Sequence, residues 1–192
     1  MNFSLVLNLL LLLCLSIEAK AQNTQYYPIF NKLKPEEQVI VLTWLNNTCN
    51  VGEEHILKNK IIALSSYLDP VFWEAYQLGP TEQDIKKLRT TAISNYMERN
   101  EWLQIFGDEQ MGKEETKRQL AITEDQYVGR VIDDYTIGYK TSAISGVGLI
   151  GKTQWQNELN QIANDPKNPA QTAAQEVLKK LLVKSSVNQK RR

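Results

Sequence analysis

The chain has 192 residues, with 22 lysines and arginines against 22 aspartates and glutamates, one histidine and two cysteines. A net charge of zero provides no global attraction to nucleic acid, so we expect no nucleic-acid partner. A hydrophobic content of 42% excludes a disordered chain, and one histidine with two cysteines cannot complete a zinc site made of those residues alone. We therefore expect a folded chain of one or two domains that holds no cofactor.

Residues 1–21 are predicted to be a secretory signal peptide. The apolar run from Leu5 to Leu15 is too short to span a bilayer comfortably, and Ala19-Lys20-Ala21 matches the small-residue preference of the peptidase. This ending resembles those of exported proteins of Gram-negative bacteria. Cleavage before Gln22 predicts a soluble protein in the periplasm or outside the cell.

After that cleavage Cys49 is the only thiol, so no disulfide can form within the chain. In an oxidising compartment a single cysteine is either buried and inert or bonded to another chain. The apolar residues that precede Cys49 favour burial. The neighbouring Asn46-Asn47-Thr48 matches a glycosylation sequon, which has a meaning only in a eukaryotic secretory pathway.

The rest of the sequence predicts an all-α fold, because apolar residues recur at every third or fourth position. A first helix opens with Pro35-Glu36-Glu37 and ends near Asn47. A second helix runs from about Glu53 to Leu68. A third has Asp69 as its N-cap, Pro70 at its first position and Leu78-Gly79 as its stop, so the last two form a hairpin.

A longer helix is predicted from about residue 80 to Phe106. The polar stretch near 107–119 then predicts a charged, mobile loop, and it is the only plausible seam in the chain. Another helix is predicted over Thr123–Tyr135. Glycines 146, 148 and 151 leave two alternatives for residues 141–150, which are a helix packed closely on a neighbour or a loop.

Two further helices are predicted at Trp155–Ala163 and from Pro169 onward, separated by the break at Asp165-Pro166. A single domain should cover residues 22–184, followed by a disordered basic tail at 185–192. Residues 167–192 hold seven basic residues against one acidic residue, whereas residues 101–166 hold six against eleven. The tail can contact an anionic surface weakly, or it can serve solubility alone.

These hairpins resemble HEAT repeats. The resemblance rests on residues 143–151, the helix pair around Asp165-Pro166, and the segment 61–79 around Asp69-Pro70. In that family paired helices stack into a superhelix, and the second helix of each pair lines a concave binding face. The resemblance therefore implies a short HEAT-like solenoid, although the two turns lie 96 residues apart with no common period. The alternative is an irregular helical bundle.

No arrangement specific to catalysis stands out in the sequence. His55 lies at neither a zinc-ligand nor a nucleophile spacing from Cys49, and residues 146–152 lack the spacing of a phosphate-binding loop. Asp133-Asp134 is the least explained of the acidic pairs, and its alternatives are an exposed helix face and a catalytic pair. It is the basis of an alternative, an enzyme or small-ligand-binding protein on an irregular bundle. We expect instead a non-catalytic module that binds a protein partner.

The predicted contact surface is the outward side of the second helix in each hairpin. At about 100° per residue, the core stripe of the last helix leaves three polar side chains pointing outward. In the earlier hairpin the same arithmetic buries Leu78 and turns Trp73 outward as an anchor; the alternative for Trp73 is packing on the neighbouring long helix. The predicted partner-binding residues are Trp73, Gln77, Thr172, Gln175 and Lys179.

Overall fold

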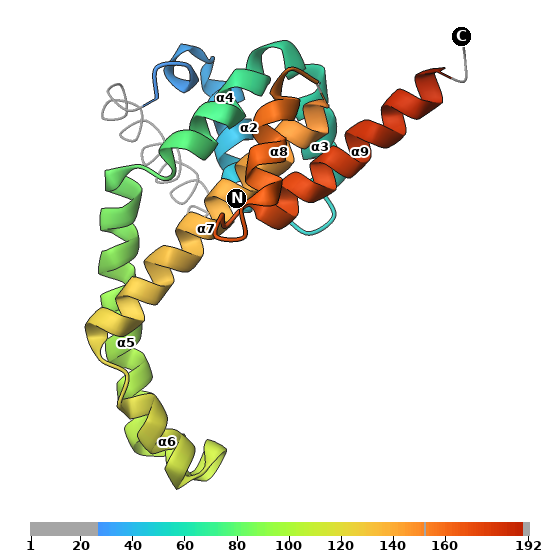
Figure 1. The fold of residues 1–192 in the computed structure, drawn as a ribbon. Helices are drawn as coiled ribbons and strands as arrows, with labels where there is room; N and C mark the ends of the chain where they lie inside the picture. Colours follow the sequence, from blue (N-terminus) through green and yellow to red (C-terminus); the bar gives the residue numbers. More distant parts are fainter. Residues whose placement is uncertain (1–26, 152, 190–192) are drawn as a thin grey trace. The chain divides into compact units, whose positions relative to one another are not determined.

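The computed structural model describes residues 27–151 and 153–189, and every regular element within them is a helix (Figure 1), which confirms the all-α prediction. The predicted signal peptide lies outside the described residues. Where the sequence predicts one domain, the chain divides into two compact units. Of the described residues, unit 1 combines 27–78 with 140–151 and 153–189, and unit 2 is Gly79–Tyr139. None of the helices in the described part combines the length and hydropathy that a membrane span requires.

Unit 1 opens with the short 3-10 helix η1 (Phe30–Lys32), which α2 (Pro35–Leu45) follows as predicted. The carboxylate of Glu37 accepts the backbone N–H of Lys34 at 2.8 Å, so the start of α2 is capped by its own first turn. The next two elements are α3 (Glu54–Ala63) and α4 (Ser65–Leu78). The break between them is at Leu64 and precedes Asp69-Pro70.

The predicted N-cap and helix start at Asp69 and Pro70 are therefore wrong, because both residues lie inside α4. Asp69 is fully buried. Its Oδ2 accepts hydrogen bonds from the indole Nε1 of Trp155 at 3.1 Å and from the side-chain amide of Gln154. The carboxylate makes contacts across unit 1 where the sequence predicts a local cap.

The second part of unit 1 contains the end of α7 (Glu124–Ile150), η2 (Thr153–Trp155), α8 (Gln156–Asn164) and α9 (Gln171–Gln189). Helices α8 and α9 pack against each other as the predicted hairpin (Figure 1). The turn between them is held by Asn168, whose Oδ1 accepts the backbone N–H of Ala170 at 3.0 Å. Helix α9 continues through residues 185–189, where the sequence predicts a disordered tail; residues 190–192 lie outside the described part.

Residues 141–150 are helical, and two glycines allow this end of α7 to approach its neighbours closely. A Cβ atom on Gly146 would lie 2.7 Å from the ring of Phe72 in α4. A Cβ atom on Gly148 would lie 2.3 Å from Cγ2 of Val177 in α9. The close-packed alternative is thus the correct one. The core around these contacts includes the fully buried Val41, Ile61, Leu68, Phe72, Ile144 and Leu159.

Unit 2 consists of α5 (Glu82–Met111), α6 (Lys113–Leu120) and the first part of α7. The charged loop predicted near 107–119 is wrong, since this stretch is helical on both sides of Gly112, which has a φ of 84°. Gly107 does not add flexibility here. It is buried, and a Cβ atom on it would lie 2.7 Å from Cγ2 of Thr116, so the glycine permits α5 and α6 to pack.

Arg99 joins α5 to the chain that leaves α6. Its guanidinium donates to the backbone carbonyl of Gln119 at 3.0 Å and lies 5.6 Å from the ring centroid of Tyr127. Nearby, the hydroxyl of Tyr96 donates to the carbonyl of Ile122 at 3.1 Å. These contacts hold unit 2 together through polar groups of its own.

Candidate functional site

The predicted anchor Trp73 is not turned outward, and this part of the prediction is wrong. Its side chain is only 8% exposed and stacks on Trp155, with ring centroids 4.9 Å apart and planes inclined by 14°. The ring that it packs on is that of Trp155, so the indole is part of the packing of unit 1. Leu78, predicted to be core, is 53% exposed. Helix α4 is buried on more than one side, and the arithmetic for a single buried face fails there.

The two tryptophans nevertheless line a pocket on unit 1, and Gln77 lies beside them. The cavity has a volume of about 540 Å³ and is mainly apolar. Such a volume lies within the range of small-ligand and short-peptide sites. The pocket therefore brings together two of the five predicted contact residues. It is lined by Pro28, Ile29, Pro70, Trp73, Glu74, Gln77, Leu78 and Trp155.

Two buried carboxylates fix the walls of this tryptophan pocket. Asp69 holds the indole N–H of Trp155, as described above. Glu74, which is also buried, accepts the backbone N–H of Ile29 at 3.0 Å and that of Phe30 at 2.9 Å. Hydrogen bonds that a carboxylate accepts are stronger than those between neutral groups, so Asp69 and Glu74 stabilise the position of the residues around the pocket.

The rim of the tryptophan pocket is exposed and carries one polar side chain. Leu78 and Ile29 extend the apolar surface outward. The amide of Gln77 is exposed and makes no hydrogen bond within the described residues. An amide group can donate to a carbonyl and accept from an N–H, which are the two groups that an extended peptide backbone presents.

The three predicted residues of α9 lie apart from this pocket. Thr172, Gln175 and Lys179 are exposed, as the helical arithmetic predicts. The amide of Gln175 donates to the backbone carbonyl of Ala163 at 3.0 Å and so caps the end of α8. None of the three is among the residues that line the tryptophan-lined pocket.

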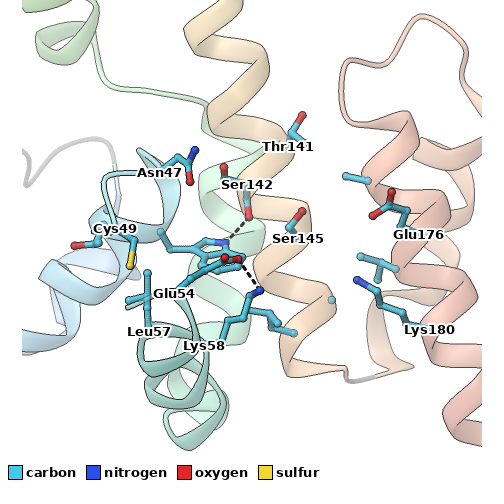
Figure 2. Close-up of a pocket in the computed structure, with 16 residues that line it drawn as sticks. Asn47, Cys49, Glu54, Leu57, Lys58, Thr141, Ser142, Ser145, Glu176 and Lys180 are labelled. Atoms are coloured by element: carbon cyan, nitrogen blue, oxygen red, sulfur yellow. Dashed lines mark hydrogen bonds and ion pairs between the residues drawn. The ribbon is translucent and has the colours of Figure 1, made fainter. Parts of the chain in front are cut away.

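A second pocket of unit 1 was not predicted from the sequence. Its cavity has a volume of about 360 Å³ and lies between the α2–α3 segment, the end of α7 and α9 (Figure 2). The floor is apolar, with Leu57, Leu149 and Val177 among its residues. The indole of Trp44 is fixed there by a 2.7 Å hydrogen bond from Nε1 to the carbonyl of Ser142. Its residues come from four helices and the α2–α3 loop, so no local motif could reveal it.

Charges of both signs line this second pocket. On the α3 side the ammonium of Lys58 lies 2.6 Å from the carboxylate of Glu54, and this contact holds the pKa of Glu54 below its usual value of 4.5. On the α9 side lie Glu176 and Lys180 (Figure 2). Within the described residues neither of these two makes an ion pair. The pocket thus has one wall with an ion pair and one wall whose ammonium and carboxylate form no ion pair with any described side chain.

The residues that the sequence offers as catalytic candidates do not line either pocket. His55 is exposed on α3, and Asp133 and Asp134 are both exposed on the part of α7 that belongs to unit 2. Within the described residues, no three side chains of the metal-ligating types are grouped as an ion site. Cys49 is a free thiol, half-buried at the edge of the second pocket.

Comparisons of the sequence with family models and with curated proteins, and of the structure with solved structures, found no match.

Proposed function

We propose that the protein is an exported, non-catalytic interaction module of short HEAT-like hairpins that binds a protein partner through the tryptophan pocket of unit 1. The observation that carries the proposal is the stacked pair Trp73 and Trp155 in an apolar pocket whose walls are fixed by buried carboxylates. Both carboxylates act on groups of the protein itself, so they hold the site and leave its interior without a free charge.

The partner that fits this chemistry is an apolar, proline-containing segment in extended conformation. Such segments dock on aromatic surfaces with little loss of conformational entropy, because the polyproline helix is already formed before binding. The aromatic and proline walls offer the apolar contact, and the amide of Gln77 offers hydrogen bonds to the peptide backbone. Thr172 and Lys179 provide a second exposed contact surface in this proposal.

The HEAT-like part of the proposal is supported by the α8–α9 hairpin, in which two antiparallel helices pack through their apolar faces. Export is supported by the sequence of residues 1–21 alone. Intact-mass measurement of the native protein should find Gln22 at the amino terminus. Recovery of the protein with Met1 retained would remove export from the proposal.

The binding test uses a displayed library of short peptides, selected on the purified chain. Selection should return apolar, proline-containing sequences, and replacing their prolines with alanine should abolish binding in fluorescence polarisation. Leu78→Glu, at the rim of the tryptophan pocket, should weaken binding about tenfold, as loss of an interface contact typically does.

The matched control is Ile62→Glu, because Ile62 is an isoleucine of α3 with 50% exposure that does not line the pocket. This variant should bind like the wild type. Equal binding by the Leu78 variant, or selection of peptides without proline, would contradict the proposal. Trp73→Ala is unsuitable as a test, since removing a buried indole destabilises the unit itself.

A further inference from the structure

The second pocket, shown in Figure 2, is a site of a different kind from the tryptophan pocket. The two share no lining residue. Instead of an apolar interior without free charge, the second pocket has two ammonium and two carboxylate groups around an apolar floor. A ligand for this site must therefore satisfy charges of both signs.

The charge balance selects the class of ligand. Glu54 and Lys58 already neutralise each other at 2.6 Å. Within the described residues Glu176 and Lys180 form no ion pair, and both belong to the same wall on α9. A simple anion would satisfy Lys180 and be repelled by Glu176, and a simple cation would do the reverse. A zwitterion satisfies both and adds no net charge.

The remaining polar groups suit the carboxylate end of such a molecule. The hydroxyls of Thr141 and Ser145 line the α7 wall, and within the described residues neither makes a hydrogen bond. Each hydroxyl can donate to a carboxylate oxygen. The floor, with Leu57 and Val177, offers contact to an apolar side chain.

We propose that this pocket binds a free α-amino acid or dipeptide with an apolar side chain. The ligand ammonium contacts Glu176, the ligand carboxylate contacts Lys180 and the α7 hydroxyls, and the side chain rests on the floor. The cavity of about 360 Å³ is at the small end of the range of ligand sites, which agrees with a ligand of this size.

Isothermal titration calorimetry of the purified chain tests the proposal with L-leucine and L-leucyl-L-leucine as probes. At least one of them should bind, and N-acetyl-L-leucine amide, which has the same side chain and no charges, should not. Lys180→Met and Glu176→Gln should each weaken binding about fivefold, because the groups are exposed and partly screened by solvent. Ser145→Tyr should abolish binding by filling the cavity.

Lys179→Met is the matched control, since Lys179 precedes Lys180 on α9 and does not line the pocket. It should bind the zwitterion like the wild type, and so should Leu78→Glu, which alters only the tryptophan pocket. Absence of binding by both probes, equal binding of the uncharged analogue, or equal weakening by Lys179→Met would overturn the proposal. Thermal melts of the Lys180 and Glu176 variants should match the wild type, because both residues are exposed.

Discussion

Gly148→Ala tests the close approach of α7 and α9 that shapes the second pocket. The new methyl group would lie 2.3 Å from Cγ2 of Val177 and 3.2 Å from both Cβ and Cγ1 of the same residue. The first distance is far below van der Waals contact, and the neighbour is the short, branched side chain of a buried residue. The two helices must therefore move apart to accept the methyl group.

Overpacking of this kind costs about 1–3 kcal/mol, while replacing a helical glycine with alanine returns up to about 1 kcal/mol. We expect a net loss of about 1–2 kcal/mol in the free energy of unfolding. Gly138→Ala is the matched control on the same helix, because no atom lies within 4 Å of the added Cβ. The control should gain about 0.5–1 kcal/mol.

Urea unfolding followed by circular dichroism measures both variants. The double variant Gly148→Ala/Val177→Ala removes the obstructing methyl groups, so its loss should be smaller than the sum of the single losses by about 1–2 kcal/mol. A Gly148→Ala protein as stable as the Gly138→Ala protein would refute the close approach. A strictly additive double variant would show that the strain does not involve Val177.

Three further changes test other parts of the structure. Glu74→Ala leaves two backbone N–H groups near η1 without an acceptor, so the free energy of unfolding should fall by about 2 kcal/mol in urea titrations; an unchanged midpoint would contradict the contact. Leu103→Ala should lower the free energy of unfolding by about 3 kcal/mol and Trp102→Ala by less than about 0.5 kcal/mol, because their side chains are 3% and 43% exposed. A larger loss for Trp102→Ala than for Leu103→Ala would contradict the orientation of α5. Lys58→Met should raise the pKa of Glu54 in an NMR titration, because the ammonium of Lys58 lowers this pKa in the wild type. The small stabilising effect of the ion pair should be lost as pH falls through the lowered pKa. An unchanged pKa of Glu54 in the variant would contradict the ion pair.

Local patterns predicted the helical elements well where one apolar face and a capping residue coincide. The hairpin of α8 and α9, closed by Asn168, is an example. The same reasoning failed at Asp69, whose local setting is that of an N-cap but whose partners are 85 and 86 residues away. It also failed at Gly107, where a glycine in a polar stretch permits helix packing and does not make a loop.

The sites were harder to predict for a related reason. The periodicity of α4 gives no sign that its sides are covered by η1, by α7 and by Trp155. The sequence therefore predicted an exposed Trp73 and a buried Leu78, and the structure shows the opposite for both. The exposure of Gln77 could be predicted because this residue lies at the end of the helix, where one side is open. The second pocket depends on side chains from distant segments, and only the spacing of Glu54 and Lys58 is visible locally.

The central claim is that a protein partner binds at the stacked tryptophans, and NMR titration tests it most directly. The chain has four tryptophans, so four indole N–H signals can be followed while a selected proline-containing peptide is added. We predict that the signals of Trp73 and Trp155 and the side-chain amide of Gln77 shift with peptide concentration, while those of Trp44 and Trp102 do not. Shifts confined to Trp44 or Trp102 would contradict the claim.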